Sequence, residues 1–161
     1  MLSTTSLVQR LKQKIDAIPV PDLVVEGDAD DAELLIVGFG GTYGHLHAAM
    51  DEMRATGKKV ALAHFKYINP LPKNTAEVLR KYPKVVVAEQ NSGQLAAWLR
   101  MKVDGFSPCQ YNEVKGQPFD VVAETIKKTA YRVDFTKCSP NDNPYCHVDY
   151  ITTHSKFFKF F

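Results

Sequence analysis

The chain has 161 residues, 45% hydrophobic and 24% charged, which is typical of a single soluble globular domain with one substantial core. The formal net charge is only +2 and the basic residues are scattered, so the composition argues against a nucleic-acid or membrane partner. No segment approaches the roughly 20 apolar residues that span a bilayer, and the N-terminus lacks the apolar core of a secretory signal. We therefore expect a cytoplasmic protein.

The cysteines support the same compartment. Cys109, Cys138 and Cys146 are an odd and sparse set, which suits a reducing cytosol better than a disulfide framework. His147 and His154 lie near the last two cysteines, but the intervals match no common zinc-ligand spacing. We expect no metal site in this chain.

Residues 4–18 have the apolar spacing of one narrow helical face, and the opposite face is polar. We interpret residues 1–18 as a docking or lead-in helix. Pro19 and Pro21 prevent the helix from continuing, and the acidic stretch Gly27–Asp31 is typical of an exposed loop.

Apolar strands then alternate with amphipathic helices. The predicted strands are 34–38, 59–65, 84–88 and 109–114, and the predicted helices are 43–56, 74–82, 93–103 and about 120–128. Buried strands separated by helices indicate βαβ units, so we predict an α/β fold over residues 19–130: three αβα layers around a mainly parallel sheet. Residues 131–161 are rich in aromatic side chains without a clear period. This tail either packs on the domain or a partner, or is a poorly ordered extension.

The segment GFGGTYG follows the first predicted strand and opens a helix, a context that can create an anion site. It places Tyr43 where a dinucleotide fingerprint needs its third glycine, and the second strand ends with His64 and Lys66 instead of an acidic residue. A P-loop motif is also lacking. Two interpretations remain open: the segment only turns the chain, or it binds a cofactor or partner. The candidate residues are Gly38, Gly40, Gly41, Thr42, Tyr43 and Gly44.

A second polar group follows the strand 84–88. Glu89, Gln90 and Asn91 should lie at the same carboxyl edge of the sheet as the glycine segment, and such edges bind ligands in open α/β folds. Helix capping by Asn91 is the structural alternative. His45 and His47 should point apart on a helix, and no nucleophile can be paired with His64 from the sequence.

Several segments together resemble one family. GFGGTYG, NPLPKN (Asn69–Asn74), EQNSGQL and KGQPF occur in the order found in the C-terminal domain of 2-oxoacid:ferredoxin oxidoreductase α subunits, with the 2-oxoglutarate type most similar. The resemblance covers roughly residues 15–128 and implies a transketolase C-terminal-like fold. The tail after Ala130 departs from it. The family's α subunits are far longer than 161 residues, so we expect a fragment, a split subunit or a truncated gene product.

The resemblance also implies a function for the parent complex. These enzymes oxidatively decarboxylate a 2-oxoacid to an acyl-CoA with thiamine diphosphate, magnesium, iron–sulfur clusters and coenzyme A, and they reduce ferredoxin. The thiamine site lies in the remainder of the α subunit and in the β subunit, which would be the partners of this chain. An iron–sulfur cluster needs about four cysteine thiolates, more than this chain has. We therefore expect a non-catalytic assembly domain with no catalytic residue and no cofactor of its own. The alternative is a stand-alone anion- or nucleotide-binding α/β module that uses the Gly38–Gly44 loop.

Overall fold

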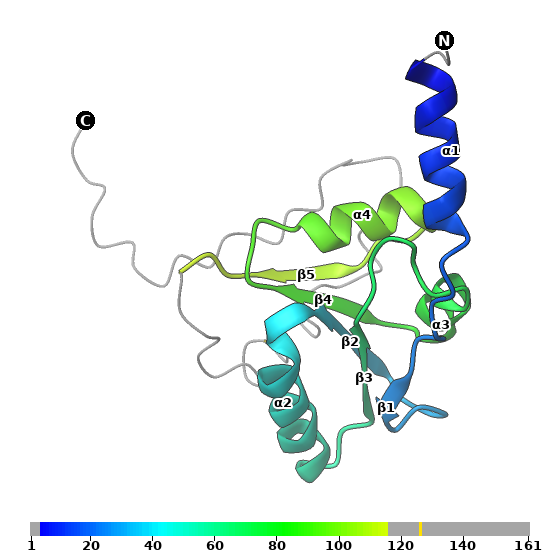
Figure 1. The fold of residues 1–161 in the computed structure, drawn as a ribbon. Coiled ribbons are helices and arrows are strands. Elements are labelled where there is room, and N and C mark those ends of the chain that lie inside the picture. The colour runs from blue at the N-terminus through cyan, green and yellow to red at the C-terminus, as the bar shows by residue number, and fades with distance from the viewer. Residues whose placement is uncertain (1–3, 116–125, 127–161) are drawn as a thin grey trace, which may run out of the picture.

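A five-stranded, mostly parallel sheet forms the centre of the domain (Figure 1). The structure is a computed structural model that describes residues 4–115 and residue Ile126. The elements in chain order are α1 Thr4–Asp16, β1 Val25–Gly27, β2 Leu34–Phe39, the 3₁₀ turn η1 Gly40–Thr42, α2 Tyr43–Ala55, β3 Val60–Phe65, α3 Thr75–Lys81, β4 Val85–Glu89, α4 Gln94–Lys102 and β5 Cys109–Asn112. The predicted α/β class with a mainly parallel sheet is confirmed.

The strands are arranged in the order β1-β3-β2-β4-β5. β2 pairs in parallel with β3 on one side and with β4 on the other, and β4 pairs in parallel with β5. The central strands β2 and β4 are almost entirely buried because helices cover both faces, which explains their unbroken apolar sequences. β1 alone is antiparallel, and it pairs with β3 at one edge of the sheet.

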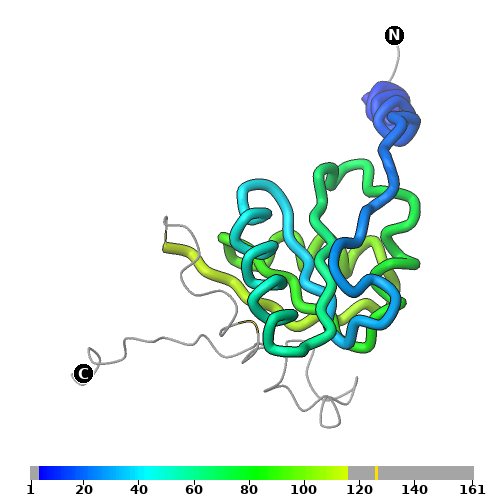
Figure 2. The backbone as a smooth tube through the Cα atoms, turned by 90° about the horizontal axis from the view of Figure 1, so that it is seen from below, coloured from blue at the N-terminus to red at the C-terminus, as the bar shows by residue number. Residues whose placement is uncertain are grey.

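Two separate cores lie on the two faces of this sheet. Leu46, Met50 and Met53 of α2 pack on one face, together with the helical residue Ile126. α3 and α4 cover the opposite face, where Leu79 and Leu99 are fully buried. The predicted three-layer arrangement is thus present, and Figures 1 and 2 show α2 on the side of the sheet away from α4.

Most element ends agree with the sequence prediction within one or two residues, but one element was missed. The segment after Pro21 was predicted to be a break and a loop, whereas Val25–Gly27 forms strand β1. The loop that follows begins with Asp28, whose side chain accepts hydrogen bonds from Arg54 and from the Val60 N–H. Three residues are too few to show an alternating pattern, and only the exposed edge of β3 makes them a strand.

The first helix stands away from the rest of the domain (Figures 1 and 2). α1 buries none of its side chains, so the predicted narrow apolar stripe is fully formed and exposed. No helix in the described ranges has the length and apolar character that crossing a bilayer requires. The predicted helix at 120–128, apart from Ile126, and the tail 131–161 lie outside the described residues.

Candidate functional site

The topology brings the two predicted polar segments to one place. α2 follows β2 on one face of the sheet, and α4 follows β4 on the other face, although β2 and β4 are neighbours. The chain therefore diverges at the carboxyl ends of these two strands, which is the position where open α/β sheets form a ligand crevice. The glycine turn after β2 and the segment Glu89–Asn91 meet there: a Cβ added at Gly38 would lie 3.6 Å from the carbonyl oxygen of Ala88.

The glycines of this turn have different physical roles. A Cβ at Gly38 would collide with the side chain of Leu46 and lie 2.9 Å from Thr42 Oγ1, so glycine allows α2 to pack closely on β2. Gly40 has a φ of +64°, a conformation that favours glycine. Gly41 and Gly44 are exposed, and a Cβ at either would meet no atom within 4 Å. Packing inside the described domain therefore explains Gly38 but not Gly41 or Gly44.

Threonine and tyrosine in the same turn hold it in place. Thr42 is buried, and its hydroxyl donates a 2.9 Å hydrogen bond to the carbonyl oxygen of Phe39. Neither Phe39 nor Thr42, at the N-terminal ends of η1 and α2, makes a side-chain capping hydrogen bond. Tyr43 is partly exposed, and its hydroxyl donates a 2.9 Å hydrogen bond to Glu26 of β1. This hydrogen bond raises the pKa of the Tyr43 phenol above its usual value.

Two histidines extend this cluster under the glycine turn. The rings of Tyr43 and His64 form a T-shaped contact with a centroid distance of 5.2 Å. Burial lowers the pKa of His64 below 6.5, because the charged imidazolium loses its hydration there. Its buried Nε2 atom has no hydrogen-bond partner. His47 lies 3.5 Å from Glu26 and 3.2 Å from Asp51, so it is held by carboxylates on both sides.

Glu89 and Asn91 occupy the N-terminus of α4. The Glu89 side chain is fully buried, and its two carboxylate oxygens accept hydrogen bonds from the N–H groups of Leu95, at 2.7 Å, and Ala96, at 2.9 Å. Asn91 Oδ1 accepts hydrogen bonds from the N–H groups of residues 93 and 94, which directly precede Leu95. All four N–H groups of the first turn are therefore taken by the protein's own oxygens, which favours the capping interpretation here.

Gln90 lies at the surface of the same loop and is exposed. Across residues 4–115 and Ile126, no group of three or more His, Cys, Asp or Glu side chains is arranged to hold a metal ion. The predicted exclusion of zinc concerned Cys138, Cys146, His147 and His154, which lie outside the described residues. The carboxyl edge thus has an exposed glycine turn beside Tyr43, which is hydrogen-bonded to Glu26, and the partly buried His64.

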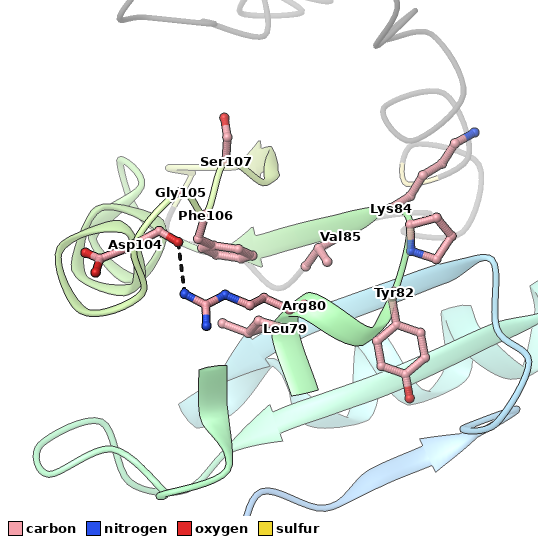
Figure 3. A pocket seen from close by; sticks show the side chains of 10 residues that line it. Leu79, Arg80, Tyr82, Lys84, Val85, Asp104, Gly105, Phe106 and Ser107 are labelled. Atoms are coloured by element: carbon pink, nitrogen blue, oxygen red, sulfur yellow. Dashed lines mark hydrogen bonds between the residues drawn. The ribbon is translucent and has the colours of Figure 1, made fainter. Parts of the chain in front are cut away.

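A separate shallow cavity of about 250 Å³ lies at the amino end of β4, away from the glycine turn (Figure 3). Arg80 of α3 reaches across it and donates a 3.1 Å hydrogen bond to the backbone carbonyl of Asp104. The ring of Phe106 and the Lys84 stem also line it. None of the residues chosen from the sequence lies in this cavity.

The comparison with protein-family models decides the family. The model of the pyruvate:ferredoxin oxidoreductase core domain II matches residues 32–124, more than half of the chain. The chain belongs to this core domain II family. The family resemblance read from the sequence is thereby confirmed, and core domain II contains both the glycine turn and the Glu89–Asn91 segment.

Two relatives make the relation more specific. The 2-oxoglutarate oxidoreductase subunit KorA of Mycobacterium tuberculosis is 55% identical over 97 residues, which are 60% of this chain and 15% of KorA. A 2-oxoglutarate:ferredoxin oxidoreductase from Magnetococcus marinus, solved with 2-oxoglutarate, coenzyme A and succinyl-CoA bound, shares the fold with a TM-score of 0.66 at 24% identity. That match covers 80% of this chain and 24% of the solved chain. The chain thus spans a small part of both relatives.

The sequence predicted that the glycine turn and Glu89–Asn91 lie at one edge of the sheet, but it did not predict the contacts beside the glycine turn. Glu26 belongs to the strand that was not predicted, and it contacts Tyr43 and His47. The contact between Tyr43 and His64 joins residues of different elements. No spacing in the sequence signals either contact, because both depend on how β1 and β3 lie beside α2.

Proposed function

We propose that this chain is a non-catalytic assembly domain of the α subunit of a 2-oxoglutarate:ferredoxin oxidoreductase. The observation that supports it is the membership in core domain II together with 55% identity to KorA over 97 residues. The parent complex would oxidatively decarboxylate 2-oxoglutarate to an acyl-CoA and reduce ferredoxin. Its partners would be the remainder of the α subunit and the β subunit, in the cytoplasm.

Two described groups of the kind that holds such cofactors, the Cys109 thiol and the Glu89 carboxylate, are buried in the fold. An iron–sulfur cluster needs about four thiolates, and Cys109, the cysteine within the described part, is buried in a core of apolar side chains. Thiamine diphosphate needs a carboxylate partner, but both oxygens of Glu89 already accept N–H groups of α4. In our proposal, as the family resemblance implies, thiamine diphosphate, magnesium, the iron–sulfur cluster and coenzyme A are bound by other parts of the complex.

The carboxyl edge then serves as a contact surface. This surface is the turn made by Gly40, Gly41, Thr42, Tyr43 and Gly44. It is fixed from inside by the close packing at Gly38 and by the hydrogen bond to Glu26, and it is open on the outside. Because no Cβ projects from the exposed glycines, another polypeptide backbone or a ligand held by another domain can approach this turn closely. The alternative, a stand-alone anion- or nucleotide-binding module that uses the Gly38–Gly44 loop, is not favoured, because the family match and the 55% identity to KorA support a domain of a larger α subunit.

A chimera tests the proposal directly. The matched segment of Mycobacterium tuberculosis KorA is replaced by the corresponding segment of this chain, and the assembled complex is assayed for reduction of ferredoxin that depends on 2-oxoglutarate and coenzyme A. We expect activity from the chimera and none from the purified 161-residue chain. A chimera that folds and assembles but does not turn over would contradict the proposal, and so would turnover by the chain alone.

A further inference from the structure

The exposed face of α1 is the feature of this structure that the proposed function leaves unexplained. Four of its apolar side chains are between 37% and 60% exposed, and they form one stripe: Leu7, Val8, Leu11 and Ile15. Helices of 13 residues are marginal in water and gain most of their stability from burying an apolar face. The described part of this chain supplies no surface that covers the stripe.

The chain that follows α1 is anchored to the domain at Leu23. Leu23 is buried, and the side chain of Asn74 accepts a hydrogen bond from its N–H and donates one to its carbonyl oxygen. Pro19 and Pro21 lie between this anchor and α1 and restrict the intervening backbone. α1 is therefore presented to the outside from a fixed point.

The charges of α1 identify the chemistry of the surface that it fits. With 3.6 residues per turn, Lys12 lies along one border of the apolar stripe, and Lys14 and Arg10 lie along the other. A second copy of this helix would bring lysines against lysines at both borders, which disfavours a homodimer. α1 also lacks the tryptophan and phenylalanine side chains that typically anchor interfacial helices in a membrane.

We propose that α1 is a docking helix whose apolar stripe binds an apolar groove with an acidic rim on another part of the same oxidoreductase. This inference rests on the proposed function for the place of the groove, since the chain spans only 15% of KorA. The apolar contacts supply the affinity, and the two basic borders fix the orientation of the helix in the groove.

The test compares stripe variants with matched variants of the polar face. The probe is KorA from Mycobacterium tuberculosis with its matched segment deleted, immobilised for binding of the full 161-residue chain. We expect the double substitution Leu11→Gln and Ile15→Gln to weaken binding at least tenfold, and Gln9→Ala with Gln13→Ala to leave it unchanged. Glutamine and alanine both favour helices, so circular dichroism should show the same helix content in all variants.

A charge test and a second measurement complete the design. Lys12→Glu with Lys14→Glu should weaken binding at 50 mM salt and reduce its salt dependence. Binding should also slow hydrogen exchange in residues 4–16. Because deleting a segment can unfold KorA, the same substitutions are introduced into the full-length chimera, with α1 included, and thermal unfolding of the assembled complex is compared.

The outcomes separate this inference from the proposed function. If the chimera is active and the stripe substitutions do not change its assembly, the docking role of α1 is overturned and the proposed function stays intact. An inactive chimera would count against both. Self-association of the chain that Leu11→Gln abolishes would assign the stripe to a second copy. Binding to vesicles of phosphatidylserine and phosphatidylcholine would assign it to a membrane. Either assignment overturns the proposal.

Discussion

The buried carboxylate of Glu89 should be one of the main determinants of stability in this domain. Its side chain is 0% exposed, and each of its oxygens accepts an N–H group from the first turn of α4. Hydrogen bonds to a charged group contribute about 1.5–3 kcal/mol each, and a buried N–H that loses its partner keeps its desolvation cost. The position of a carboxylate at a helix N-terminus adds a favourable interaction with the helix dipole.

These terms give different expectations for two substitutions. Glu89→Ala removes both acceptors, so it should lower the free energy of unfolding by about 3–5 kcal/mol. Glu89→Gln keeps one acceptor oxygen but turns an amide NH₂ toward a backbone donor, so it should cost about 1.5–3 kcal/mol. Since domains unfold with about 5–15 kcal/mol, the alanine variant would be close to its limit of stability.

Urea denaturation at pH 7 measures these differences. With a slope of about 2 kcal/mol/M, Glu89→Gln should move the urea midpoint down by about 1 M. Gln94→Ala, at an exposed position in the same turn of α4, is the control and should change the free energy of unfolding by less than about 0.5 kcal/mol. A Glu89→Gln protein within about 0.5 kcal/mol of the wild type would refute the capping argument.

Gly38, Asp28 and His64 give three further tests. Gly38→Ala should lower the free energy of unfolding, measured by urea denaturation, by about 1–3 kcal/mol, because the added Cβ collides with Leu46 of α2. Gly41→Ala should be nearly neutral, and equal effects of the two substitutions would contradict this assignment. The pKa of Asp28 is lowered by its hydrogen bond to Arg54, so its stabilisation is present above about pH 3.8 and is lost as the pH falls through the lower folded pKa. Circular dichroism during acid titration should therefore show that Asp28→Asn loses less stability on acidification than the wild type does. Burial lowers the pKa of His64, so that group destabilises the fold as the pH falls below 6.5; NMR titration giving a value of 6.5 or higher would be inconsistent with this.

The sequence alone determined the layers of this protein. The unbroken apolar runs of β2, β3 and β4 can be buried only between two layers of helices, and the intervening amphipathic segments supply those helices. The parallel direction of the strands follows, because each crossover is a helix. Local chemistry also predicted that Asn91 would cap a helix, and its side-chain oxygen accepts the N–H groups of residues 93 and 94.

The tertiary structure decided what the local pattern left open. Strand β1 exists because β3 offers an unpaired edge, and with β1 comes Glu26, the partner of Tyr43 and His47. The role of Gly38 depends on the side chain of Leu46 above it, and the role of Glu89 depends on where α4 begins. Each of these contacts joins residues several positions or elements apart. Sequence periodicity describes which face of an element is apolar, but only the packed fold determines which polar atoms meet.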